Sequence, residues 1–176
     1  MRPGRTSAVV SAIAIGALGS LVPAPAAVAD TSLFTDRSGD APPGLDIERV
    51  RVGNGARIVV SVSFDNIKRD SGNGLVVYFD TRGPDRGPEY LTTGGLGATR
   101  DWQALRIENW RGDDARLLHR CDIDMRVNHV RDKATFDLSR RCFHRPGRVR
   151  VAARSRGMSN DDWAPRVRRF YDWVSR

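Results

Sequence analysis

The chain has 176 residues, with 29 Lys and Arg against 21 Asp and Glu, which gives a net charge of +8. Only Lys68 and Lys133 are lysines, and an excess made almost wholly of arginine fits GC-rich codon usage as well as it fits phosphate binding. Specific nucleic-acid binding is therefore not expected, although a basic protein associates weakly with anionic polymers and membrane surfaces at low salt.

The first 29 residues have the features of a cleavable secretory signal. Arg2 and Arg5 precede an apolar run from Ala8 to Val22, and Ala27-Val28-Ala29 has the small-x-small pattern that signal peptidase cleaves. The alternative is an uncleaved anchor, but a membrane span needs roughly 20 apolar residues. We predict a signal peptide at 1–29 and a secreted, extracellular protein with a single domain at 30–176, no membrane span and a net charge of +6, from 27 basic and 21 acidic residues.

Three aspartates lie in a loop near the start of this domain. Asp36, Asp40 and Asp46 are separated by glycines and prolines, and hard oxygen ligands on a flexible backbone are what calcium requires. These three residues are therefore a candidate site for a structural calcium ion. The alternative is that Asp36 and Asp46 cap turns while Asp40 is solvated.

The next segments alternate in a way that is typical of strands. Residues 56–64 place Ile58, Val60, Val62 and Phe64 on one face, and Gly53-Asn54-Gly55 predicts a hairpin turn to a strand at 45–52 that needs a bulge or a change of burial midway. Further strands are expected at 74–80, 90–93, 102–110, 115–125, 134–138 and 148–155, without intervening helices. This pattern predicts an all-β fold, an antiparallel β-sandwich of about eight to nine strands. The tail at 161–176 fits either a helical face or an edge strand, and we favour extended structure.

The opening of the domain resembles known proteins. The residues that carry the resemblance are Asp36-Arg-Ser-Gly39-Asp40, Asp46-Ile47, Val50-x-Val52, Val77-Tyr78-Phe79-Asp80-Thr81 and Gly87-Pro88-Glu89-Tyr90. They resemble secreted actinobacterial proteins of unknown function and, more distantly, the β-sandwich superfamily of the DOMON domains and the family-nine carbohydrate-binding modules. The resemblance implies a sandwich that binds haem or sugar, with structural calcium near its start in some members. No Met and His pair is placed as haem ligands, so the resemblance implies a fold and not an activity.

The expected strand at 102–110 carries a candidate ligand platform. Without a bulge, it places Trp102, Arg106, Glu108 and Trp110 on one face, where indole rings stack on sugars and charged groups bond hydroxyls. The alternative is that the tryptophans form a second core layer and Arg106 extends outward to solvent.

Cys121 and Cys142 are the only cysteines, an even count in a chain predicted to be exported. An oxidising compartment favours a disulfide between them. A zinc site is a poor rival, since further Cys or His ligands at the required spacing are missing.

Four arginines alternate with small and apolar residues on the strand at 148–155 and just beyond it. Arg148, Arg150, Arg154 and Arg156 would form a row on one sheet face, with residues two apart roughly 7 Å from each other. The row is a candidate polyanion-binding track. The alternative is an ordinary solvent face whose arginines pair with acids on neighbouring strands.

The sequence shows no catalytic motif. No serine lies in a nucleophile elbow, no glycine-rich phosphate loop precedes a helix, and His119, His129 and His144 are not closely spaced. We therefore expect a secreted, non-catalytic, monomeric binding or cell-envelope-associated module, with a carbohydrate or wall polymer as its ligand. The alternative is a secreted hydrolase or inhibitor whose site converges from distant strands.

Overall fold

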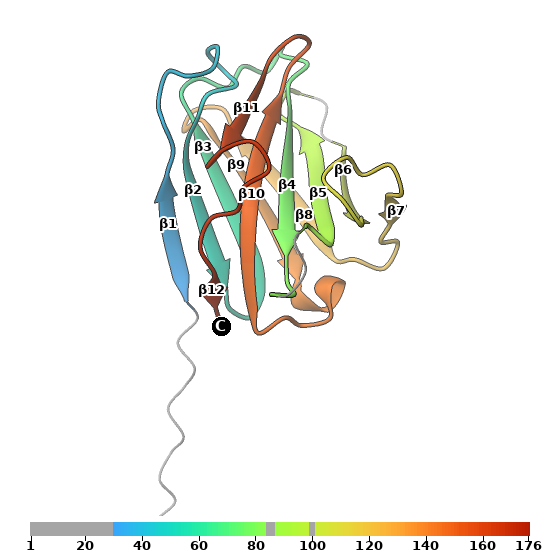
Figure 1. Cartoon of the computed structure of the whole chain (residues 1–176). Helices are drawn as coiled ribbons and strands as arrows, with labels where there is room; N and C mark the ends of the chain where they lie inside the picture. The colour runs from blue at the N-terminus through green and yellow to red at the C-terminus, as the bar shows by residue number, and fades with distance from the viewer. Residues whose placement is uncertain (1–29, 84–86, 99–100) are drawn as a thin grey trace, which may run out of the picture.

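Two antiparallel β-sheets pack face to face in a computed structural model that describes residues 30–83, 87–98 and 101–176 (Figure 1). The predicted signal peptide at 1–29 lies outside the described residues. The five-stranded sheet has the order β1-β2-β3-β9-β8, with bounds Thr31–Thr35, Ile47–Asn54, Arg57–Phe64, Lys133–Ser139 and Ile123–Asn128. The seven-stranded sheet has the order β11-β10-β4-β5-β6-β7, with bounds Asp161–Ala164, Arg148–Arg156, Gly74–Asp80, Tyr90–Gly95, Trp102–Arg106 and Arg116–Leu117; its seventh strand, β12 (Val174–Ser175), pairs with β10. The predicted antiparallel β-sandwich is confirmed.

The main core lies between the two sheets. It is formed by alternate side chains of β2, β3 and β9 on one side and of β4 and β10 on the other, including the fully buried Val60, Phe136, Phe79 and Val151. Strand β4 is buried on both faces, as its apolar run predicts, because Val76 and Tyr78 point away from the main core into a second apolar cluster on the outer face of the seven-stranded sheet. The hydrophobic effect on this inter-sheet layer is the main driving force for the fold.

The predicted hairpin is present as β2 and β3, and its register explains the irregular alternation of the first strand. The pairing shifts between Ile47 and Arg49, so that Glu48 is the additional residue of a bulge. After the bulge, Val50 and Val52 point inward with Ile47, and all three are fully buried. The extra residue shifts the alternation by one position, so that the apolar side chains after the bulge again point into the core.

The strand boundaries differ from the expectation at three places, and the described residues contain twelve strands instead of eight or nine. Strand β1 was not expected, because it is an edge strand in which only Ser32 and Phe34 are even half-buried. The strand expected at 102–110 ends at Arg106, and the one expected at 115–125 is divided into β7 and β8 by the loop that contains Cys121. The tail is extended, as we favoured, with two short strands and no helix at 161–176.

The disulfide between Cys121 and Cys142 is present, with the two Cα atoms 4.9 Å apart. It joins the loop before β8 to the 3-10 helix η1 (Arg140–Phe143), which follows β9. Within the described part of the chain, no helix has the length and apolar character that crossing a membrane requires.

Candidate functional site

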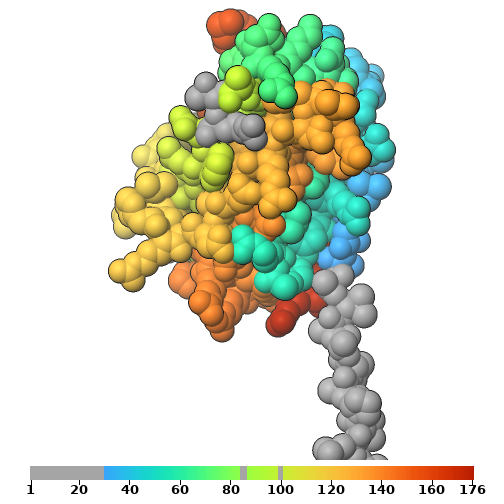
Figure 2. All heavy atoms as spheres, turned by 180° about the vertical axis from the view of Figure 1, so that it is seen from behind, coloured from blue at the N-terminus to red at the C-terminus, as the bar shows by residue number. Residues whose placement is uncertain are grey.

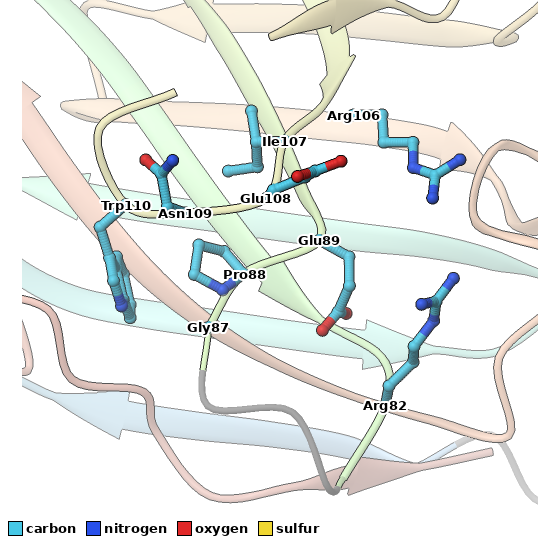
Figure 3. A pocket seen from close by; sticks show the side chains of 9 residues that line it. All are labelled: Arg82, Gly87, Pro88, Glu89, Arg106, Ile107, Glu108, Asn109 and Trp110. Atoms are coloured by element: carbon cyan, nitrogen blue, oxygen red, sulfur yellow. The ribbon is translucent and has the colours of Figure 1, made fainter. Parts of the chain in front are cut away.

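An open pocket of about 510 Å³ lies at the end of the seven-stranded sheet, between the β4–β5 connection and the β6–β7 connection (Figure 3). Its volume is within the roughly 300–1,000 Å³ that is typical of small-molecule sites. The residues that line it are Arg82, Gly87, Pro88, Glu89, Arg106, Ile107, Glu108, Asn109 and Trp110. Three of the four predicted platform residues, Arg106, Glu108 and Trp110, therefore meet at one pocket.

The β6–β7 connection is held in shape by its own polar residues. The Asn109 side-chain oxygen accepts hydrogen bonds from the backbone N–H groups of Arg111 (2.7 Å) and Gly112 (3.0 Å), and Gly112 has a positive φ of 71°. The backbone N–H of Ile107 donates to the carbonyl of Glu89 at 2.9 Å, which ties the connection to the residue that precedes β5. An Asx turn of this kind fixes a loop without regular structure. Glu108 and Trp110 are thereby presented at the pocket by an ordered backbone.

Glu89 is the least exposed charged residue of the pocket, with 8% of its surface accessible. One carboxylate oxygen accepts hydrogen bonds from the backbone N–H of Thr81 (2.7 Å) and from its hydroxyl (3.0 Å). The other oxygen, Oε1, is buried and has no hydrogen-bond partner among the described residues. Burial raises the pKa of Glu89, and the Thr81 hydrogen bonds oppose this shift in part. A buried polar atom without a partner is uncommon, and a bound ligand is one way in which such an atom gains a partner.

The predicted platform differs from the structure because Trp102 and Trp110 lie on opposite faces of the sheet. Trp102 pairs with Gly94, where a Cβ atom would meet the side chain of the core residue Met125, so Trp102 lies on the core-facing side of the sheet. The Trp102 indole N–H donates a hydrogen bond to the carbonyl of Ile123 at 3.2 Å. Trp110 instead belongs to the outer cluster, with ring centroids 5.1 Å from Tyr78, 4.6 Å from Phe170 and 6.0 Å from Trp163. Alternation would place both indoles on one face only if the strand continued as far as Trp110. The prediction differs from the structure because β6 ends at Arg106.

The four arginines of β10 form a row on the outer face, but three of them have partners there. Arg150 bonds Asp80, and Arg154 bonds Asp161. Their guanidinium groups also cover aromatic rings: Arg150 lies 4.6 Å from the centroid of Trp173, Arg154 lies 5.0 Å from that of Trp163, and Arg148 lies 4.3 Å from that of Trp173. Such cation–π contacts stabilise a sheet face. The row therefore matches an ordinary sheet face with paired arginines more closely than it matches a track of free arginines for a polyanion.

A second basic surface, on the outer face of the five-stranded sheet, was not recognised in the sequence. Arg49 and Arg51 of β2 and Lys133 of β9 surround Ser61 and Ser63 of β3 and line a hollow of about 420 Å³. Figure 2 shows the side of the molecule that carries this sheet, with the teal residues of β3 beside the orange residues of β9. Among residues 30–83, 87–98 and 101–176, no carboxylate forms an ion pair with Arg51 or Lys133. The alternation of β2 places Arg49 and Arg51 on one face, so the sequence contained a signal for these two residues. Lys133 joins them only through the pairing of β3 with β9.

The three aspartates of the predicted calcium site lie at the opposite end of the sandwich from the pocket. Carboxylate oxygens of Asp40 and Asp46 lie within 4.8 Å of each other and of an oxygen of Asp162, a residue of β11 that the sequence prediction missed. Asp36 is near this group, and burial, with smaller contributions from the other three carboxylates, raises the pKa of Asp36 to about 6. The Asp162 carboxylate accepts a hydrogen bond of 2.6 Å from the backbone N–H of Ile47, 115 residues away in sequence.

The fold and the pocket together define a two-sheet antiparallel β-sandwich with an open, polar and charged site at the end of one sheet. Comparison of the sequence with models of known protein families and with curated proteins finds no match.

Proposed function

We propose that this chain is an extracytoplasmic, non-catalytic binding protein whose pocket holds a carbohydrate segment of a cell-envelope polymer. The observation that carries the proposal is the buried, unpartnered Oε1 of Glu89 in a pocket that Arg106, Glu108 and Trp110 also line. The proposed secretion is supported by the amino-terminal sequence pattern.

The chemistry of the pocket suits a ligand with many hydroxyl groups. Arg106 offers several N–H donors and Glu108 offers acceptors, and both side chains are exposed, so that neither has to be uncovered before a ligand binds. Trp110 is half-buried, and its accessible part provides an apolar surface for the C–H face of a sugar ring. Glu89 is 8% accessible at the pocket, and a rotation of its side chain toward the pocket would let a ligand hydroxyl supply the partner that Oε1 lacks.

The test compares binding of the protein and its variants to neutral and acidic cell-wall polysaccharides by calorimetry. Arg106→Ala and Glu108→Gln should each weaken binding by about 10- to 100-fold, since hydrogen bonds to charged groups contribute roughly 1.5–3 kcal/mol. Arg131→Ala and Asp113→Asn, exposed and outside the pocket lining, are the controls and should bind normally.

Two results would contradict the proposal. Equal affinity of the pocket variants and the controls would place binding elsewhere. Release of reducing ends from the same polysaccharides, lost in the Glu89→Gln variant, would identify a hydrolase, the alternative function.

Polyanion binding is a second candidate, and the structure offers two surfaces for it. The exposed ends of the β10 row, Arg148 and Arg156, retain accessible charge, but Arg148 stacks on the Trp173 ring. Arg51 and Lys133 form no ion pair with the described residues and border a hollow of about 420 Å³. We favour the surface on the five-stranded sheet for this reason.

The two surfaces can be distinguished by the salt dependence of binding to a linear polyphosphate. The affinity falls with salt, and each lost phosphate contact makes the negative slope of log K against log salt shallower by about 0.7–0.9. The double variant Arg51→Ser/Lys133→Ser should make the slope shallower by roughly 1.5, and Arg148→Ser/Arg156→Ser should change it little. A larger effect of the β10 pair would support the row on β10, and no salt-dependent binding at all would reject both surfaces.

A further inference from the structure

The disulfide between Cys121 and Cys142 lies in the wall of an open hollow of about 410 Å³, beside η1 at the end of β9. The other residues that line this hollow are Leu117, Leu118, His119, Arg120, Arg141 and His144. We propose that the hollow is a thiol–disulfide exchange site, in which an anionic thiol attacks the Cys121–Cys142 bridge. The proposal is independent of the carbohydrate pocket, because the two sites share no lining residue.

The bridge is accessible from solvent because its neighbours in the chain are exposed. His119 and Arg120 are exposed on one side of it, and Arg141 and His144 are exposed on the other. Both cysteines are half-buried and line the hollow, so a small thiol that enters the hollow contacts the bridge. Attack on a disulfide requires access to a sulfur atom, and a bridge inside a core reacts only after unfolding. This bridge can therefore react in the folded protein.

The charge of the hollow favours an anionic thiol. Each of the two cysteines directly follows an arginine, Arg120 or Arg141, and the residues that line the hollow include no carboxylate among those the structure describes. The carboxylate beside the bridge, Asp122, forms an ion pair of 2.7 Å with Arg57. Among residues 30–83, 87–98 and 101–176, no carboxylate forms an ion pair with Arg120 or Arg141. These two positive charges are therefore available to a ligand.

Positive charge beside the bridge assists both the approach of the thiol and the exchange step. The thiolate forms a bond with one Sγ atom, the Cys121–Cys142 S–S bond breaks, and the electron pair of that bond leaves on the other Sγ as a thiolate. The arginines attract the anionic thiol and stabilise the leaving thiolate, because a nearby positive charge favours the thiolate form of a cysteine. The products are a mixed disulfide and one cysteine thiolate, so no further oxidant or reductant takes part.

The two sides of the bridge differ in how they are held. In η1, Phe143 is buried and its ring stacks on Tyr90 with the centroids 4.3 Å apart. Arg140 of η1 is also buried, and it donates to the carbonyl of Gly55 at 3.2 Å. Cys121 instead lies in the loop between β7 and β8. Opening of the bridge therefore frees this loop and leaves η1 in place, so that exchange does not require unfolding of the core.

The test compares the reaction of the folded protein with three small thiols of similar size. They are 2-mercaptoethanesulfonate, which is anionic, 2-mercaptoethanol, which is neutral, and cysteamine, which is cationic. Acid stops the exchange by protonating the thiolates, and mass spectrometry then measures the loss of the bridged protein. At equal thiolate concentration and low salt, the anionic thiol should react about 5- to 20-fold faster than the neutral one, and the cationic thiol should react more slowly than both. The differences should largely disappear in 1 M salt, where the screening length is about 3 Å.

Arg120→Ser/Arg141→Ser is the decisive variant, because both arginines are exposed and their replacement should leave the fold intact. It should remove most of the preference for the anionic thiol, and Arg120→Lys/Arg141→Lys should keep that preference. Arg37→Ser/Arg131→Ser is the matched control, since it removes two positive charges from exposed positions outside the hollow. The control should keep the preference of the original protein.

Three results would overturn the proposal. A rate that stops rising with thiol concentration would show that the bridge reacts only after unfolding, because the unfolding rate then limits the exchange. Equal rates for the three thiols at equal thiolate concentration would show that the charge of the hollow has no effect on the exchange. An equal preference in the Arg120→Ser/Arg141→Ser variant and in the matched control would show that these two arginines do not recognise the thiol.

Discussion

Replacement of Arg150 with alanine should lower the free energy of unfolding by about 3–5 kcal/mol, the cost of breaking a buried ion pair from one side. Its partner Asp80 is fully buried, and the guanidinium bonds one Asp80 oxygen through Nε (2.7 Å) and through a terminal nitrogen (2.5 Å). Without Arg150 the Asp80 carboxylate remains inside the protein without its counter-charge. The rings of Phe170 and Trp173, whose centroids lie 4.9 and 4.6 Å from the guanidinium, would also lose a contact.

Urea unfolding measures this effect, and Arg156→Ala is the matched control. Arg156 lies on the same face of the same strand, but it is exposed and forms no ion pair with the described residues. Its replacement should change the stability by less than about 0.5 kcal/mol. If the two variants were equally stable, the Arg150–Asp80 pair would not be a structural element of the sheet. The result also bears on polyanion binding, because a charge reversal at Arg150 would lower the stability of the protein together with the charge of the β10 row.

Loss of the disulfide should have the next largest effect. The double variant Cys121→Ser/Cys142→Ser removes a bridge between residues 21 positions apart, and the chain-entropy relation gives a loss of about 3 kcal/mol for a loop of this length. The bridge fastens the loop before β8 to η1, and the strand that precedes this loop, β7, consists of two exposed residues.

Thermal unfolding with and without a reducing agent measures the contribution of the disulfide. The reducing agent should lower the melting temperature of the original protein and leave that of the double variant unchanged. A melting temperature that reduction does not affect would show that the loop is held by its other contacts instead.

The parts of the fold that were predictable from the sequence are those that local alternation determines. The alternation of β3 survives in the structure because Ile58, Val60, Val62 and Phe64 all point into one core. The uninterrupted apolar run of β4 indicated burial on both faces for the same reason. Strand β1 was missed because an exposed edge strand with a single half-buried aromatic residue has little such signal.

The sites were less predictable because non-local pairings assemble them. Arg106, Glu108 and Trp110 were recognised from one segment, but Glu89 joins them only through the pairing of β5 with β6. Asp162 reaches the aspartates of the candidate calcium site because β11 lies beside the start of β2, which no pattern within either segment indicates. The same applies to Arg150, since its charge is balanced by Asp80 across the β4–β10 pair.

The most direct test of the proposed function is a map of ligand contacts by nuclear magnetic resonance on the isotope-labelled protein. A soluble fragment of a wall polysaccharide that the protein binds should shift the indole N–H signal of Trp110 and the backbone signals of Glu89 and Glu108. The indole of Trp102, on the opposite face of the sheet, should not move. Shifts confined to Trp102 or to the Arg51 and Lys133 surface, with none at Trp110 or Glu89, would contradict the assignment of the pocket as the binding site.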